Sequence, residues 1–204
     1  MNGRGPFPAG TVDWSGENPG MYLRESETGP FVGLVTFFRV FLSPHGRGEG
    51  VVLLEAPEAA KSAPAALNLC VSNNEPMMRW LIEHFVSNFG SFKGKLALQG
   101  LEFRKLNQVR TRSDLPRGYV EEVSGEGAEI RLAWEDLSAP FMVDLPPGKS
   151  ATGKHEMFSL FVDSRKASAT INGRALKGRS QPRDFAGRQS STAFLAFSET
   201  WVKV

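Results

Sequence analysis

The C-terminal segment, residues 192–204, is apolar on both faces of a predicted β-strand, and this feature constrains the fold most strongly. Side chains along a strand alternate between its two faces, so Phe194 and Ala196 lie opposite Leu195 and Phe197. A strand that is apolar on both faces is usually covered on both sides or belongs to a closed or curved sheet. The segment therefore predicts a barrel or a sandwich.

Strand patterns recur along the rest of the chain. Residues 30–42 form a long β-branched and aromatic segment, and shorter alternating segments follow it. Residues 156–163 and 167–172 are interpreted as a hairpin around a turn at residues 163–166. The predicted fold is mainly β: a single-domain, curved antiparallel sheet or barrel, calycin-like or a sandwich, of about ten strands.

One helix is predicted over residues 74–89. Asn74 is a suitable N-cap, Pro76 is tolerated in the first turn, and Gly90 is a natural stop. Residues 1–28 are rich in Gly, Pro and polar residues, which predicts an irregular N-terminal arm with room for one short strand around residues 11–14. The whole chain, residues 1–204, is expected to form a single domain.

Composition limits the classes of function. The net charge of +2 gives no reason to expect a nucleic-acid partner, and a lone cysteine excludes an intrachain disulfide. No apolar run is long enough for a membrane helix, and the first residues do not resemble a secretory signal. We therefore expect a soluble, cytoplasmic protein with no membrane partner, no metal and no cofactor. The sequence is compatible with a monomer or a homo-oligomer. Fifteen Phe against two Tyr favour a dry core or an apolar cavity.

Two charged residues interrupt aromatic strand faces. Arg39 lies between two phenylalanines of one predicted face, and Glu199 lies between Phe197 and Trp201. Burying either charge alone costs several kcal/mol, so the two are expected to meet each other or a polar ligand in an aromatic-lined cavity. The alternative is that both faces turn outward into water. The predicted ligand-binding residues are Arg39, Glu199, Trp201, Phe37 and Phe197.

A basic, Gly-rich loop covers residues 173–189. Its guanidinium groups are suited to binding a phosphate or a carboxylate, so Arg174, Arg179 and Arg183 are predicted to bind an anion. The alternative is a solvated connection in which an arginine pairs with Asp184.

No familiar catalytic or phosphate-binding motif occurs in the chain. The candidate catalytic residues are Glu199 and His84, the latter because histidine titrates near neutral pH. The first hypothesis is a binding module for a small apolar or amphipathic molecule, which can be neutral or anionic. The second is a small lyase, isomerase or hydrolase that uses a buried Glu/Arg pair or a histidine.

Overall fold

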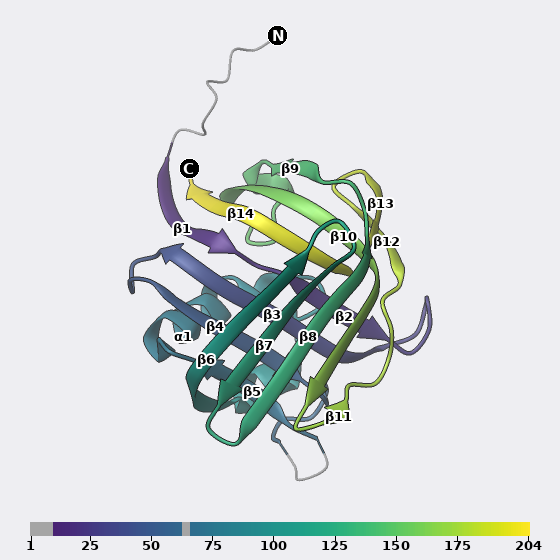
Figure 1. Ribbon diagram of the computed structural model, residues 1–204. Helices are drawn as coiled ribbons and strands as arrows, with labels where there is room; N and C mark the ends of the chain where they lie inside the picture. The colour runs from purple at the N-terminus through teal and green to yellow at the C-terminus, as the bar shows by residue number, and fades with distance from the viewer. Residues whose placement is uncertain (1–9, 63–65) are drawn as a thin grey trace.

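The computed structural model describes residues 10–62 and 66–204, and strands dominate this part of the chain (Figure 1). The helices are α1 (Glu75–His84) and three short 3-10 helices, η1 (Val86–Asn88), η2 (Leu96–Gly100) and η3 (Pro147–Lys149). The strands are β1 (Thr11–Glu17), β2 (Gly20–Arg24), β3 (Phe31–Leu42), β4 (Gly48–Leu54), β5 (Asn68–Ser72), β6 (Glu102–Asp114), β7 (Gly118–Gly125), β8 (Ala128–Leu137), β9 (Phe141–Leu145), β10 (His155–Ile171), β11 (Arg174–Ala175), β12 (Pro182–Phe185), β13 (Arg188–Ser191) and β14 (Ala193–Lys203).

Nine strands close into a barrel. The pairing runs from β2 through β3, β4, β5, β6, β7, β8 and β10 to β14, and β14 pairs back with β2. Strands β1, β9 and β11 extend the sheet, while β12 and β13 form a separate hairpin. The β5–β6 pair is parallel, because α1 and two 3-10 helices form the connection between these strands. The predicted mainly β fold is confirmed, and it is a closed barrel rather than a sandwich.

The barrel wall carries apolar side chains on both of its surfaces. One cluster, the inner core, contains residues from all nine barrel strands, such as Val35, and therefore fills the barrel interior. Trp134 is fully buried there, and its Nε1 donates a hydrogen bond of 3.0 Å to the Gly20 carbonyl oxygen. A second cluster, the outer core, contains the neighbouring outward-facing side chains, such as Leu34, together with residues of α1.

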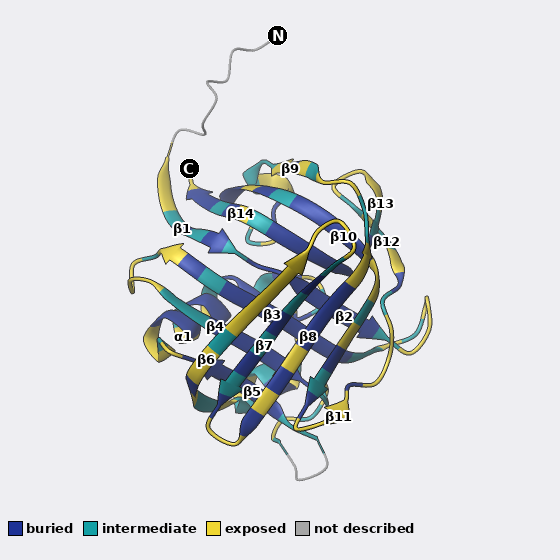
Figure 2. Ribbon diagram, in the orientation of Figure 1, coloured by how far each residue is buried: buried dark blue, intermediate teal, exposed yellow. Residues whose placement is uncertain are grey.

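The covering of the outer surface explains the apolar pattern of the strands. β4 and β5 are almost entirely buried, because the outer core lies against one of their surfaces (Figure 2). β6 is exposed along most of its length and is rich in polar residues. The strands that are apolar on both faces therefore lie between the inner core and the outer core.

Helix α1 begins as predicted. Asn74 is the N-cap, and its side chain accepts a hydrogen bond of 3.1 Å from the backbone N–H of Met77. The helix ends at His84, earlier than predicted, because the backbone of Phe85 leaves helical geometry and the chain continues as η1. The predicted apolar face is buried through Met77, Met78, Leu81 and Ile82.

Two predictions of local structure are wrong. The arm expected over residues 1–28 is not irregular: β1 extends the short strand expected around residues 11–14, and β2 was not predicted because Gly-rich composition hid its alternation. Residues 1–9 lie outside the described part of the chain. The hairpin expected around residues 163–166 is one continuous strand, β10. Its first half pairs with β14 and β9, and its second half pairs with β8. The change of partner falls at residues 163–166, the segment predicted as a turn. Ser164 is buried there and donates to the Glu135 carbonyl oxygen at 2.8 Å.

Strand β14 contains a β-bulge at Ser198, which has a positive φ of 51°. The paired segments of β10 and β14 differ by one residue at this point. The extra residue reverses the alternation, so Leu195 and Phe197 belong to the inner core and Trp201 to the outer core. The prediction that Phe197, Glu199 and Trp201 share one face is therefore wrong.

The bulge makes a testable prediction. Ser198→Val is expected to lower the free energy of unfolding by about 1–2 kcal/mol, because a β-branched residue is strained at positive φ. Ser198→Gly is expected to stay within about 0.5 kcal/mol of wild type, since glycine adopts this conformation freely. Urea unfolding of both variants measures the difference. Ser168→Val, at an exposed β10 position whose φ is not positive, is the control. Equal stability of the two Ser198 variants would contradict the strain.

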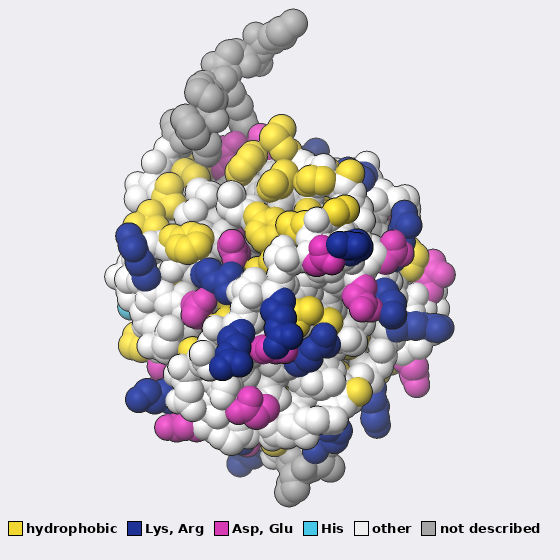
Figure 3. Space-filling view, viewed as in Figure 1, with side chains coloured by type: hydrophobic (Ala, Val, Ile, Leu, Met, Phe, Trp, Pro, Cys, Tyr) yellow, Lys and Arg dark blue, Asp and Glu magenta, His cyan; other side chains and the backbone are white. Residues whose placement is uncertain are grey.

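Apolar side chains also gather on the outside of the molecule. Figure 3 shows them over the region where β1, β9, β14 and the start of β10 lie. Patches of this kind often mark surfaces that contact another molecule. Homo-oligomerisation stays a prediction. The large exposed apolar residues in or next to these elements are Val12, Met142, Phe158 and Val204.

Candidate ligand-binding cavity

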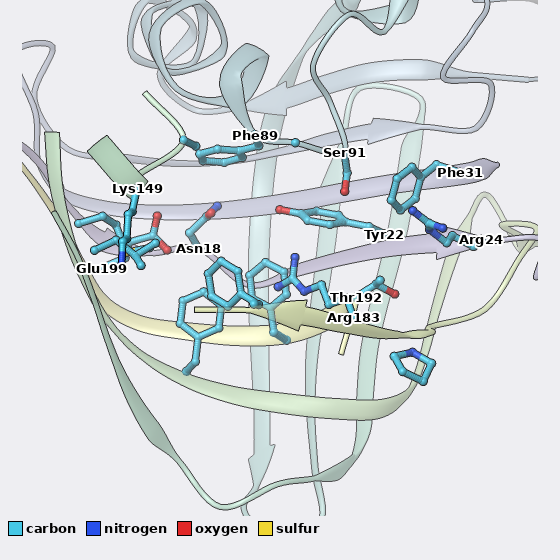
Figure 4. A pocket seen from close by; sticks show the side chains of 18 of the residues that line it. Asn18, Tyr22, Arg24, Phe31, Phe89, Ser91, Lys149, Arg183, Thr192 and Glu199 are labelled. Carbon is cyan, nitrogen blue, oxygen red and sulfur yellow. The ribbon is translucent and has the colours of Figure 1, made fainter. Parts of the chain in front are cut away.

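A cavity of about 590 Å³ lies against the outer surface of the barrel wall. Its floor is formed by outward-facing side chains of β2, β10 and β14, among them Tyr22, Phe161 and Phe194. Its rim comes from the segment after η1, from the chain around η3 and from the β12–β13 hairpin (Figure 4). The volume is within the usual range for small-molecule sites, about 300–1,000 Å³.

Aromatic rings form a continuous wall on one side of this cavity. Phe161 and Phe194 stack with their ring centroids 4.9 Å apart. Tyr22 packs edge-on against Phe194 at 5.4 Å, and Phe185 of β12 lies 5.1 Å from Phe161. Such a wall offers a large apolar contact surface to the body of a ligand.

Arg183 extends from β12 into this aromatic wall. Its guanidinium carbon lies 4.5 Å from the ring centroid of Phe185, 4.8 Å from that of Phe194 and 5.8 Å from that of Tyr22. Its Nε and Nη2 atoms are buried and find no hydrogen-bond partner within residues 10–62 and 66–204. Burial lowers the pKa of Arg183, while Tyr22 and Asp163 act in the opposite direction. An arginine remains charged even so.

A second arginine, Arg24, also lines the cavity. Its guanidinium carbon lies 4.3 Å over the ring of Phe31, and its Nη1 donates to the Glu27 carbonyl oxygen at 2.9 Å. Its Nε is buried and has no partner in the described part of the chain. Of the five buried side-chain polar atoms that lack a partner there, three thus belong to Arg24 and Arg183.

Glu199 lines the cavity and is 3% exposed. Its Oε1 accepts a hydrogen bond of 2.7 Å from Nε1 of Trp201. Burial raises the pKa of the Glu199 carboxyl to about 8, although the hydrogen bond from Trp201 acts in the opposite direction. At neutral pH the carboxyl therefore holds its proton and can donate a hydrogen bond.

Figure 4 shows how the polar groups are distributed. Glu199 and Lys149 lie at one end of the cavity, Arg24 lies at the other, and Tyr22 lies between them. Burial raises the pKa of the Tyr22 hydroxyl above its ordinary value, and this hydroxyl senses both Arg183, which lowers the pKa, and Glu199, which raises it. Tyr22 therefore lies within electrostatic reach of both Arg183 and Glu199.

The structure separates the residues that were predicted to bind one ligand. Glu199 and Trp201 line the cavity, whereas Arg39, Phe37 and Phe197 do not. Phe37 and Phe197 lie in the inner core or against it. The bulge in β14 causes the separation, because it turns Glu199 and Trp201 away from the barrel interior.

The predicted pairing of Arg39 with Glu199 is wrong. Arg39 lies on the inner side of the wall and forms ion pairs of 2.6 Å with Glu17, 2.8 Å with Glu49 and 3.1 Å with Glu121. We call these four residues the Arg39 cluster. β1, β4 and β7 supply its carboxylates, whereas Glu199 lines the cavity and accepts a hydrogen bond from Trp201.

The three arginines of the predicted anion-binding loop do not converge. Arg174 forms an ion pair of 2.6 Å with Glu55, and Arg179 is exposed, with only its backbone bonded to that of Arg24. Arg183 alone of the three lines the cavity. The loop folds into the β12–β13 hairpin, which carries Arg183 inward and leaves the other two outside.

The two predicted catalytic residues also lie apart. His84 is the last residue of α1, its ring lies 5.8 Å from that of Trp80, and it does not line the cavity. A different histidine is the buried one. His155 contacts Thr152 through Nδ1 at 2.8 Å and Asp13 through Nε2 at 2.7 Å, and so ties β1 to the start of β10.

Several cavity residues were missed from the sequence. Tyr22 and Arg24 lie in a segment interpreted as an irregular arm. The alternation of Met21 and Leu23 with these two residues was the available signal, since it marks a strand with one face in the inner core. Phe161 was placed in a strand but not assigned to a site, because nothing local shows what covers it.

Among residues 10–62 and 66–204, no group of three or more His, Cys, Asp and Glu side chains is placed to hold a metal ion. None of the helices described there is long and apolar enough to cross a membrane. Comparison of the chain with protein-family models, curated proteins and solved structures finds no match. Function is therefore argued from the cavity itself.

Proposed function

We propose that the protein binds a small amphipathic carboxylic acid in the cavity on the outer surface of the barrel. The observation that carries the proposal is Arg183, a cation placed among aromatic rings with two buried, unpaired nitrogen atoms. Asp163 lies within electrostatic reach of Arg183 but forms no ion pair with it in the described part of the chain, so an anionic ligand can supply the direct partner that its two buried nitrogens lack.

The geometry of Arg183 favours a carboxylate. Its unpaired atoms, Nε and Nη2, form one edge of the planar guanidinium group. This edge presents two parallel N–H donors, which match the two oxygens of a carboxylate. The residues lining the cavity include three basic side chains, Arg24, Lys149 and Arg183, against the single acidic side chain of Glu199. The electrostatic balance therefore also favours an anion.

The aromatic wall supports an apolar body for the ligand. Phe161, Phe185 and Phe194 surround the guanidinium with hydrocarbon surface. Burial of apolar ligand surface contributes about 25 cal/mol per Å². Orientation then comes from the few polar groups, as is usual in small-molecule sites.

A second candidate function is proton-transfer catalysis by Glu199. The supporting observation is a buried carboxyl whose pKa of about 8 suits an acid–base group at neutral pH. A lyase, isomerase or hydrolase of this kind would bind its substrate through the same Arg183. His84 has no part in this candidate, because it does not line the cavity.

Calorimetry of Arg183→Met tests the proposed function. Octanoate and phenylacetate are expected to bind wild type more tightly than the corresponding alcohols and amides. Arg183→Met should weaken acid binding by about tenfold to 150-fold, because a charged hydrogen bond contributes about 1.5–3 kcal/mol. The change in stability should be small, since the variant removes two buried nitrogens without hydrogen-bond partners but also the electrostatic interaction of Arg183 with Asp163.

Arg179→Met is the matched control, because Arg179 is exposed and uses only its backbone in contacts with β2. It should bind the acids as wild type does. Equal binding of acids and neutral analogues, or unchanged acid affinity in Arg183→Met, would contradict the proposal. A response to inorganic phosphate alone would point to a different anion.

A further inference from the structure

The cavity contains two polar regions of different chemistry. The unpaired N–H donors that carry positive charge belong to Arg24, at one end of the cavity, and to Arg183, which is labelled between Arg24 and Glu199 in Figure 4. At the other end the polar groups are the carboxyl of Glu199, the amide of Asn18 and the amine of Lys149 (Figure 4). A ligand that fills the cavity meets both regions.

The N–H groups beside Glu199 already donate hydrogen bonds within the protein. The Asn18 amide nitrogen donates to the Thr36 hydroxyl at 2.7 Å and to the Phe37 carbonyl oxygen at 3.0 Å. Trp201 Nε1 is bound to one carboxyl oxygen of Glu199. The Glu199 carboxyl itself lines the cavity, where a ligand can contact it.

Burial outweighs the groups around Glu199 in setting its pKa. Tyr22 on β2 is buried. Lys149 of η3 lies at the same end of the cavity as Glu199 (Figure 4), but its side chain is exposed, so solvent screens its charge. Arg183 lies in the aromatic wall and interacts electrostatically with Tyr22 and Asp163. The carboxyl therefore stays in its acid form at neutral pH, with one proton to donate.

We propose that the ligand is a bifunctional acid whose carboxylate binds Arg183 and whose far end presents a neutral hydrogen-bond acceptor, such as a carbonyl or ester oxygen, to Glu199. This inference rests on the proposed function. An amine at the far end is disfavoured, because the lining residues already carry three basic side chains. A purely apolar far end would leave the Glu199 donor buried and unpaired, which is unfavourable.

Half-esters of dicarboxylic acids test this inference against monoacids of the same length. The pairs are methyl hydrogen adipate with octanoate and methyl hydrogen suberate with decanoate. Calorimetry at about pH 6.5 should show at least one half-ester binding about 3-fold to 10-fold more tightly than its monoacid. The advantage should disappear at about pH 9, where an ionised Glu199 can no longer donate to the ester oxygen.

Two variants assign the effect to Glu199. Glu199→Gln keeps a donor at every pH, so the half-ester advantage should persist at about pH 9. Glu199→Leu has no donor, so the advantage should be absent at both pH values. Arg183-dependent binding of the monoacids in both variants shows that the cavity is intact.

The outcomes separate the two proposals. Monoacids that bind through Arg183 without any half-ester advantage would overturn the bifunctional ligand and leave the proposed function standing. An advantage that survives in Glu199→Leu would also overturn the bifunctional ligand, since another group would then be the donor. Failure of every acid to bind would overturn the proposed function and the inference with it.

Discussion

Arg39→Met is expected to lower the free energy of unfolding by about 3–5 kcal/mol, because it leaves buried carboxylates without their counter-charge. Arg39 is the cation of the Arg39 cluster, and it contacts Glu17, Glu49 and Glu121 within 3.1 Å. The Glu121 side chain is fully buried, and its remaining protein donors are the hydroxyl groups of Tyr119 and a threonine. These neutral groups do not replace a guanidinium.

Two further variants separate burial from charge in this prediction. Arg112→Met removes an ion pair with Glu122 in which the arginine side chain is 70% exposed. It should cost less than about 1 kcal/mol. The double variant Arg39→Met/Glu121→Gln should recover much of the loss, since it leaves no fully buried lone charge. Urea unfolding measures all four proteins, and a loss in Arg39→Met no larger than that in Arg112→Met would contradict the argument.

The fold class could be predicted because the alternation of side chains is a local property. Residues 192–204 are apolar on both faces, and up to Phe197 the structure places one face in the inner core and the other in the outer core. The parallel β5–β6 pair could not be predicted, because the order of strands is decided by packing between distant segments. The continuous course of β10 was missed for the same reason.

The bulge at Ser198 had no sequence signal. Serine is not a residue that favours positive φ, so neither composition nor spacing marks the position. The consequence for the site was large. One extra residue moves Glu199 and Trp201 from the inner core to the cavity, while Phe197 stays at the inner core. A strict period of two therefore assigned the wrong neighbours to Glu199.

The burial of two charged residues could be predicted from residue types alone. A single charge between aromatic residues indicates burial, and the structure shows Glu199 at 3% exposure and the Arg39 side chain at 19%. The ion-pair partners of a buried charge depend on the register between strands, which places Glu17, Glu49 and Glu121 beside Arg39. Arg183 was identified within a basic loop, but only the β12–β13 hairpin distinguishes it from its neighbours.

The pH dependence of stability should reveal the burial of Glu199. A glutamate in an unfolded chain ionises near its ordinary pKa, about 4.3, whereas burial raises the pKa of folded Glu199 to about 8. Between these values the folded protein holds a proton that the unfolded chain has released. Raising the pH therefore favours unfolding, by about 1.4 kcal/mol per pH unit for a single group. Above about pH 8 both states are ionised, and the loss ends.

Glu199→Gln isolates this contribution, because its side-chain oxygen can still accept the hydrogen bond from Trp201 but cannot ionise. The stability of the variant relative to wild type should rise between about pH 5 and pH 8 by on the order of 3 kcal/mol. Other titrating groups cancel in this difference, since they are common to both proteins. Glu122→Gln, at a surface ion pair, is the control and should follow the wild-type pH dependence closely. Urea unfolding across this pH range gives the comparison. Parallel curves for wild type and Glu199→Gln would mean that folded Glu199 ionises as an ordinary carboxyl, and the donor assigned to it in the cavity would be lost.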